Sequence, residues 1–397
     1  MSKKEKAGLV PRFRFPEFRD SGEWGSKSIS ELLDYERPDR YIVDSTNYND
    51  YGVPVLTANK SFLLGYTEEH HGVYTDVPVI IFDDFTVDYK YVDFPFKIKS
   101  SAIKMLKPKA KNILKFVYEL MGTIKFEPQE HKRHYISVYQ HLIVGVPNFK
   151  EQKKITDCLS SLDDLINAEN KKLALLKAHK KGLMQKLFPA EGKTVPELRF
   201  PVFRDDDKWK MKMLGQFADV VMCKRIFANE TNENDDVPFY KISTLGGKAD
   251  AFISQELFEE YKLKYSYPKK GEILITCSGT IGKCVPYNGE DAYYQDSNIV
   301  WIDNPTNELR NEFLLLLLSN VNWSKLNSTT ITRIYGSDLR NLALRFPKNE
   351  KEQQKITSCL SALDKCIIAQ ADKIENLKVH KIGLMQGLFP SVLEVIE

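Results

Sequence analysis

Apolar residues recur at alternating steps of four and three along two long stretches of the chain, residues 151–189 and 352–390. A period of 3.5 residues keeps one narrow apolar seam facing a partner helix, which is typical of a coiled coil. We therefore predict two long helices that pair through this seam. The predicted pairing residues are Ile155, Leu159, Leu162, Ile166, Leu173 and Leu176 in the first stretch, and Ile356, Leu360, Leu363, Ile367, Ile374 and Leu377 in the second.

The two stretches are copies of one sequence. Aligned without a gap, they are identical at 24 of 39 positions. Both begin with Glu-Gln-x-Lys-Ile and end with Gly-Leu-Met-Gln-x-Leu-Phe-Pro, where the proline stops the helix. The seam is interrupted at equivalent polar positions, Glu169 and Lys180 in the first copy and Gln370 and Lys381 in the second. A polar residue in a seam lowers stability but can fix the register of the pair.

Two matched helices in one chain most simply pack on each other, and we expect the pair to be antiparallel. An ordinary helical hairpin and a seam between two copies of the chain are the alternatives. The rest of the sequence disfavours them because it is repeated too. Residues 14–20 return as residues 199–205, an Arg-Phe-Pro segment in both cases, and Trp24 is matched by Trp209. The chain is thus a tandem of two units, each with an Arg-Phe-Pro segment, a variable block and a long helix.

The variable blocks contain short apolar runs separated by turns. In the first block we predict a buried strand at residues 77–82, a turn at Asp83 and Asp84, and a helix at residues 112–121. In the second block we predict strands at residues 237–242, 270–276 and 297–302, a glycine-containing turn at 278–283 and a helix at 312–321.

The predicted fold class is α+β, with two similar mixed α/β domains joined by two long helices that pack as an antiparallel coiled coil. The tandem repeat should give the chain pseudo-twofold symmetry. The expected boundaries are residues 1–150 for the first domain, 151–190 for the first helix, 191–350 for the second domain, and 351–397 for the second helix and the tail.

Composition excludes some classes of protein. With 42% hydrophobic and 28% charged residues, most of the chain is expected to fold. The net charge is only +3, so nucleic-acid binding would need local basic patches. One candidate is residues 97–115, with seven lysines and no acidic residue, which could be a solvated face or could track phosphates. Six scattered cysteines without a Cys-x-x-Cys pair indicate a reducing cytoplasm and no zinc site.

Nothing in the sequence points to a membrane. Residues 1–6 lack the apolar core of a signal peptide, and the leucine run at 314–318 is far too short to span a bilayer. We therefore expect a cytoplasmic protein.

The sequence contains no recognised catalytic motif. Gly279 to Lys283 lacks the spacing of a phosphate-binding loop, and no Asn-Pro-Pro-Tyr or Asp-Pro-Pro-Tyr tetrapeptide of an amino-methyltransferase is present. The Glu151-Gln152-Lys153 sequence resembles half of a nuclease motif, but it lies at a helix start. No acidic partner can be placed beside His70 and His71, so we expect a surface pair. With no catalytic residues and no metal ligands recognised, the sequence predicts a binding protein rather than an enzyme.

The duplicated motifs resemble those of the specificity subunit of type I restriction–modification systems, over nearly all of the chain. The resemblance rests on Arg-Phe-Pro-x-Phe, Glu-Gln-x-Lys-Ile and Gly-Leu-Met-Gln-x-Leu-Phe-Pro, each present twice. The second block adds Gly-Glu-Ile-Leu-Ile at 271–275 and Ser-Gly-Thr-Ile-Gly at 278–282, whereas the first block lacks the Gly-Thr-Ile-Gly turn.

The resemblance implies a non-catalytic subunit without a cofactor of its own. Its two domains would be target-recognition domains, each reading one half of a split sequence in double-stranded DNA. The paired helices, along the seam residues named above, would dock two methyltransferase subunits, and restriction subunits would join that core. S-adenosylmethionine, ATP and magnesium would belong to these partner subunits.

Base readout requires Arg, Lys, Asn or Gln at loop tips, and basic or hydroxyl groups position the protein on phosphates. Arg133 and Arg333 recur in the two blocks, so we expect them to contact the DNA backbone rather than bases. Each candidate lysine could also be a plain surface charge, and each tyrosine a core residue. The candidates are Asn59, Lys60, Lys90, Tyr91, Arg133 and Tyr135 in the first block, and Lys224, Arg225, Lys241, Ser243, Lys283, Arg333 and Tyr335 in the second.

The helices suggest how far apart the two half-sites lie. A helix of about 36 residues is roughly 54 Å long. Two domains on such a pair could meet major grooves about one turn of DNA apart, which predicts half-sites of about 3–4 bp separated by roughly 5–8 bp. Two other functions compete with this interpretation. One is a coiled-coil structural adaptor without DNA readout, and the other is a methyltransferase or nuclease in its own right, which the missing motifs disfavour.

Overall fold

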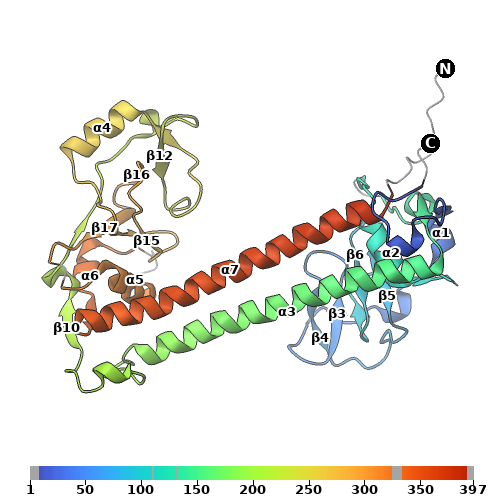
Figure 1. Cartoon of the computed structure of the whole chain (residues 1–397), viewed down its shortest axis with the longest axis horizontal. Helices are drawn as coiled ribbons and strands as arrows, with labels where there is room; N and C mark the ends of the chain where they lie inside the picture. Colours follow the sequence, from blue (N-terminus) through green and yellow to red (C-terminus); the bar gives the residue numbers. More distant parts are fainter. Residues whose placement is uncertain (1–8, 110, 130–131, 307, 324–332, 391–397) are drawn as a thin grey trace. The chain divides into compact units, whose positions relative to one another are not determined.

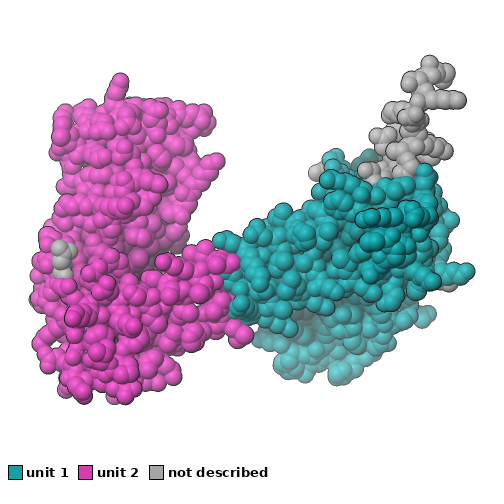
Figure 2. Space-filling model, in the orientation of Figure 1, with its two compact units in different colours: residues 1–172, 370–397 teal, residues 173–369 magenta. Residues whose placement is uncertain are grey.

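The computed structural model describes residues 9–109, 111–129, 132–306, 308–323 and 333–390. The chain forms two compact units, shown in different colours in Figure 2. Unit 1 comprises residues 1–172 and 370–397, and unit 2 comprises residues 173–369. Each unit therefore holds one variable block, the first part of one long helix and the last part of the other. The boundaries expected from the sequence fall at the helix ends, whereas the compact units divide within the helices.

Unit 1 is built on three sheets within the described residues (Figure 1). A two-stranded sheet pairs β1 (Gly25–Ser28) with β9 (Ile143–Val146). A four-stranded antiparallel sheet has the order β2 (Leu33–Glu36), β8 (Ile103–Pro108), β5 (Val79–Asp83), β6 (Tyr89–Val92). A third has the order β4 (Leu63–Thr67), β3 (Val53–Leu56), β7 (Lys97–Ile98), with β3 and β7 parallel. The helices of the block are α1 (Ile29–Leu32) and α2 (Leu114–Met121), with 3-10 turns at Pro16–Phe18, Asp39–Tyr41 and Tyr139–His141.

Unit 2 repeats this plan in the part of the chain that is described. Its sheets are β10 (Lys210–Met213) with β18 (Ala343–Phe346); β11 (Asp219–Val221), β17 (Ile299–Asp303), β14 (Ile273–Thr276), β15 (Cys284–Pro286); and β13 (Phe252–Ile253), β12 (Val237–Tyr240), β16 (Tyr293–Tyr294). Its helices are α4 (Gln255–Lys264), α5 (Asn311–Ser319) and α6 (Gly336–Arg340), with 3-10 turns at Pro201–Phe203, Leu214–Gln216 and Ala228–Glu230. The strand orders match those of unit 1 sheet by sheet, which confirms the duplication.

The predicted strands and helices of the blocks are present, with shifts of at most three residues at their ends. The run predicted at 77–82 forms β5, which is buried at every position because it lies inside its sheet between β8 and β6. The predicted helices form α2 and α5. Helix α4 was not predicted. Its start is fixed by Ser254, whose side chain accepts a hydrogen bond from the Leu257 amide at 3.2 Å.

The two long helices are α3 (Phe149–Leu187) and α7 (Glu350–Leu388). Each begins two residues before the predicted start and ends at the leucine just before Phe-Pro, as expected from the proline. All the predicted pairing residues are buried or half-buried, while most other residues of these helices are exposed. The seam is therefore confirmed.

The polar residues of the seam form contacts between the helices. In unit 1, Lys381 Nζ lies 2.7 Å from Asp163, and Gln370 donates to the Glu169 carboxylate at 2.6 Å. In unit 2, Lys180 Nζ lies 2.5 Å from Asp364, the equivalent of the Lys381–Asp163 contact. Residue numbers fall on one helix as they rise on the other, so the helices are antiparallel within each unit. Glu169 and Gln370 are equivalent positions of the two sequence repeats, so each helix contributes the same repeat position to this contact.

A buried ion pair joins the Arg-Phe-Pro segment to the start of each long helix. Arg14 donates from Nε and Nη2 to the two carboxylate oxygens of Glu151, at 2.7 and 2.8 Å, and Trp24 Nε1 donates to the same carboxylate at 3.2 Å. Glu151 is 1% exposed. A bidentate guanidinium–carboxylate pair is both directional and strong. This role for Glu151 excludes the nuclease interpretation of Glu151-Gln152-Lys153.

The same contact between the Arg-Phe-Pro segment and the helix start, which we call the helix joint, is repeated in unit 2. Arg199 donates to Glu352 at 2.8 and 2.7 Å, and the Trp209 indole donates to it at 3.3 Å. The neighbouring glutamine completes the joint in both units. Gln353 accepts from the Arg310 amide before α5 and donates to the Pro347 carbonyl, both at 3.0 Å. Gln152 does the same with the Ile113 amide before α2, at 3.1 Å, and with the Pro147 carbonyl.

Replacing Glu352 by alanine should leave the Arg199 guanidinium buried without its counter-charge. We expect Glu352→Ala to lower the free energy of unfolding by about 3–5 kcal/mol, measured by chemical denaturation. The matched control is Glu350→Ala, two residues away on the same helix and exposed, which should change stability by about 0.5 kcal/mol or less. Equal losses in the two variants would contradict the joint.

The Glu169 carboxylate should give the helix pair a pH-dependent contribution. Hydrogen bonds from Lys373 and then Gln370 lower the pKa of Glu169 below its usual value of 4.5. A lowered pKa stabilises the fold above the unfolded-state pKa, and that stability is lost as the pH falls through the folded-state pKa. Glu169→Gln should therefore melt below the wild type near neutral pH.

That difference in melting temperature should shrink as the pH falls below about 4. Glu375→Gln, which alters an exposed carboxylate on α7, should show a much smaller difference at every pH. A melting difference for Glu169→Gln that is constant across pH would count against the ionic contribution.

Candidate nucleic-acid interface

The recurring arginines lie at equivalent places, beside the ends of β5 and β14. In unit 1 the His134 amide donates to the Asp84 carbonyl at 2.8 Å, directly after β5. In unit 2 the Ile334 amide donates to the Cys277 carbonyl, directly after β14, also at 2.8 Å. The sheets therefore place Arg133 and Arg333 on matching edges of their units.

In unit 1, Arg133 is exposed, with its guanidinium 5.6 Å from the centre of the Phe85 ring. It lines a cleft together with Arg37 and Lys104, which were not among the predicted candidates. The repeat could not reveal Arg37, because the equivalent residue of the second block is Met222. Lys104 is one of seven lysines in the lysine-rich stretch, and the sequence does not distinguish it from the other six.

In unit 2, two predicted candidates, Arg333 and Arg225, contact the turn before β17. Arg333 donates from Nη2 to the Ser297 carbonyl at 3.2 Å, and its guanidinium lies 5.7 Å from the centre of the exposed Tyr335 ring. Arg225 donates to the carboxylate of the adjacent Asp296 at 3.0 Å. The sequence-adjacent Lys224 lies over the Tyr265 ring. This gives unit 2 a cationic edge with two aromatic rings.

The other candidates of unit 2 lie in more ordinary surroundings. Lys241 pairs with Asp250 at 3.1 Å, and Ser243 is exposed. Lys283, at the end of the glycine-containing turn, donates from its side chain to the Leu245 carbonyl. In that turn Gly282 has a φ of +76°, and a Cβ there would clash with the Trp323 ring. Packing against Trp323 therefore requires glycine at position 282, and the turn has a structural role. This agrees with the sequence, which lacks the spacing of a phosphate-binding loop.

The remaining candidates of unit 1 are divided between surface and core. Lys60 is exposed, and Asn59 accepts a hydrogen bond from the Thr86 hydroxyl at 3.2 Å. Lys90 and Tyr91 are half-buried on β6. Tyr135 is 1% exposed and packs against Phe82, so the core alternative applies to it. Its ring has no access to DNA in this structure.

The structure contradicts both interpretations of the lysine-rich stretch at 97–115, the solvated face and the phosphate-tracking surface. Five of its seven lysines are paired with carboxylates of unit 1, and Lys97 and Lys104 are buried. The stretch is therefore neither a solvated face nor a free phosphate track, because folding brings acidic residues from elsewhere in the chain against it. The pairs are Lys97–Glu69, Lys104–Asp84, Lys107 with Glu36 and Asp76, Lys109–Asp34, and Lys115 with Glu119 and Asp163.

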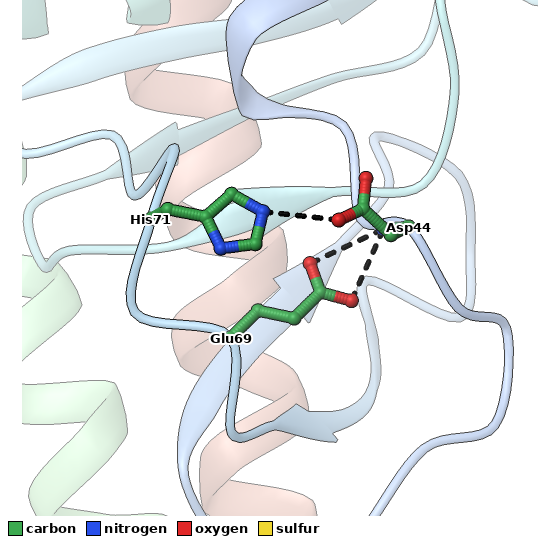
Figure 3. Close-up of side chains that lie close together, drawn as sticks. All are labelled: Asp44, Glu69 and His71. Carbon is green, nitrogen blue, oxygen red and sulfur yellow. Dashed lines mark hydrogen bonds and ion pairs between the residues drawn. The ribbon is translucent and has the colours of Figure 1, made fainter.

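His70 and His71 are both exposed, which confirms the predicted surface pair, but the expected lack of an acidic partner is wrong. His71 does have an acidic partner, since its Nε2 lies 3.0 Å from the Asp44 carboxylate, and Glu69 lies beside them (Figure 3). The ligand atoms of these three residues lie within 4.8 Å of one another, close enough to hold a cation. Glu69 is already engaged, however, by Lys97 at 2.6 Å and by the Asp44 and Ser45 amides. Burial alone would raise the pKa of Glu69, but these contacts outweigh it and lower that pKa.

Comparison with known proteins agrees with this architecture. The family described as "Type I restriction modification DNA specificity domain" matches residues 21–178 and 206–379, one match for each repeat. A type I restriction enzyme specificity subunit of Haemophilus influenzae is 32% identical over 352 residues, covering 86% of this chain and 87% of that protein. The EcoR124I/EcoR124II specificity subunit of Escherichia coli is 47% identical over 126 residues, 30% of this chain and 31% of that one.

A solved structure shares the fold. The S subunit of a type I restriction–modification system from M. genitalium superposes with a TM-score of 0.61 at 15% identity, covering 97% of this chain and 100% of that chain. In the described part of this chain, no helix is long and apolar enough to cross a membrane. Taken with the duplicated joint and the two matched domain ranges, these likenesses show that the chain belongs to the family of type I restriction–modification DNA specificity subunits.

Proposed function

We propose that this chain is the DNA sequence-recognition subunit of a type I restriction–modification complex, and that units 1 and 2 each read one half of a bipartite target in double-stranded DNA. The observation that carries the proposal is a duplicated scaffold with different surface residues. The three sheets and the helix joint are the same in both units, yet Arg37 and Asp39 of one are Met222 and Lys224 in the other. Two recognition domains that share one scaffold but contact different bases would show this pattern.

The paired helices are proposed to set the distance between the half-sites. Helix α3 begins in unit 1, ends in unit 2 and has 39 residues. Its length is about 58 Å at about 1.5 Å per residue. That length supports a spacer of roughly 5–8 unread base pairs between half-sites of about 3–4 bp.

Repeated exposed residues on the helices support docking of two identical partner subunits. Packing within the chain does not require exposed residues to be the same in both copies, so their repetition points to a repeated partner surface. The exposed residues shared by both copies include Lys177, His179 and Gln185, repeated as Lys378, His380 and Gln386.

We infer that these partners are two methyltransferase subunits and that restriction subunits bind the resulting core. The chain itself would be non-catalytic and hold no cofactor, with S-adenosylmethionine, ATP and magnesium bound by the partner subunits. Such a complex would act in the cytoplasm.

Genome-wide mapping of methylated adenines should test the DNA-recognition role. We expect adenine methylation at one bipartite motif in cells that contain this chain, and its loss when the gene is deleted. Footprinting of the reconstituted complex should protect both half-sites. If methylation persisted without the chain, or no bipartite site were protected, a structural adaptor without DNA readout would be favoured.

Lengthening the helix pair should lengthen the spacer. We expect four residues, about one turn, inserted after Asn170 and after its equivalent Ala371 to add roughly 6 Å to each helix. The methylated motif should gain one or two spacer base pairs while both half-sites stay unchanged. The control replaces the exposed Lys171 and Asp372 by alanine without changing helix length, which should leave the motif as it is. A spacer that stayed fixed after the insertion would refute the helix pair as the measure of distance.

A further inference from the structure

We propose that a cleft in unit 1, beside Arg133, binds one phosphate group of the DNA backbone next to the first half-site. This inference rests on the proposed function and adds a binding site for a named chemical group. The cleft has a volume of about 170 Å³ and lies between the end of β2, the start of β8 and the segment that carries Arg133. Its polar lining consists of Arg37, Asp39, Asp84, Ser101, Lys104 and Arg133.

Two of these residues neutralise each other. Lys104 Nζ lies 3.3 Å from one carboxylate oxygen of Asp84, and both side chains are almost fully buried. The other carboxylate oxygen of Asp84 accepts a hydrogen bond from the Tyr135 amide at 2.8 Å. Asp84 is therefore fully engaged and does not oppose an anion in the cleft as a free carboxylate would.

The two arginines carry the charge that remains. Arg37 and Arg133 are both exposed, and neither forms an ion pair with any described residue. The contact of Arg133 is with the Phe85 ring, which fixes the guanidinium without neutralising it. Against these two positive charges the cleft has one further carboxylate, Asp39. The net charge favours an anion.

The donor geometry favours a phosphate. A guanidinium presents a planar fork of N–H donors that matches two oxygens of one phosphate, and it stays charged at every physiological pH. Ser101 adds a hydroxyl donor to the lining of the cleft. Contacts of this kind, from arginine and serine to phosphate oxygens, fix the register of a protein on DNA without selecting bases.

Unit 2 carries a related set of groups at the same place. The Asp84 amide donates to the Ala102 carbonyl, and the Cys277 amide donates to the Asn298 carbonyl, so Ser101 corresponds to Ser297. Arg333 corresponds to Arg133. The other cleft positions differ, since Arg37 and Asp39 of unit 1 are Met222 and Lys224 in unit 2. Retention of an arginine and a serine, despite changed side chains around them, suits a backbone contact that both half-sites need.

The test is the salt dependence of DNA binding by the complete complex, with DNA that contains the methylated motif. The variants are Arg37→Gln, Arg133→Gln and the double variant. Each should lower the slope of log affinity against log salt by about 0.9, the value for one lost phosphate contact. Between about 50 and 200 mM salt, their affinity should fall about three- to fourfold less than that of the wild type.

Further variants test whether the two arginines hold the same phosphate. The double variant should match the single ones, because both guanidinium groups would hold one phosphate. Arg133→Lys should keep the wild-type slope. Arg19→Gln, an exposed arginine outside the cleft, should keep it too. Preference among base substitutions in the first half-site should not change in any variant.

Several outcomes would overturn the proposal. Slopes for Arg37→Gln and Arg133→Gln that equal the Arg19→Gln slope would remove the phosphate contact while leaving the proposed function intact, and a changed base preference would make the arginines base readers. Saturable binding of inorganic phosphate without DNA, lost in Arg133→Gln while the DNA slope is unchanged, would assign the cleft to a free anion. A wild-type complex that does not bind the motif at all would sink this inference together with the proposed function.

Discussion

The buried arginine–glutamate pair at the start of each long helix is the interaction on which the rest of the structure depends. Removing two charges from water is costly, so Arg199 and Glu352 add little net stability compared with an apolar contact. What they provide is direction, because a bidentate pair that also receives an indole N–H allows one geometry. The joint fixes the point and the direction in which the helix leaves its domain. The placement of the seam residues along that helix depends on this geometry.

The seam shows how charge can be used inside an apolar contact. Its leucines and isoleucines would accept several registers, since they repeat regularly along both helices. The polar positions remove that freedom, because Glu169 requires Gln370 and Lys373 opposite it, and Lys381 requires Asp163. The equivalence of Lys180–Asp364 with Lys381–Asp163 gives the same restriction in unit 2. Apolar residues supply the attraction and a few charges select the alignment.

The sequence predicted what depends on periodicity and missed what depends on contacts between distant residues. Helices α3 and α7 and their seam follow from repeating apolar patterns, and strand β5 from a continuous apolar run, which one sequence displays directly. The partners of the lysines at 97–115, the Asp44–His71 contact and the burial of Tyr135 arise only when separate segments meet. For the same reason Arg37 was overlooked. Arg133 and Arg333 were selected by residue type and repetition, and Lys224 and Arg225 by residue type alone, while the DNA contacts of all candidates remain predictions.

The joint also has a consequence for how such proteins evolve. The residues that hold each unit to its helices lie in two short segments, before and after the variable block. They are identical in both copies. A block exchanged between those segments by recombination would arrive with its outward surface changed and its attachment intact. New specificities could thus arise by trading whole modules, without a series of unstable intermediates.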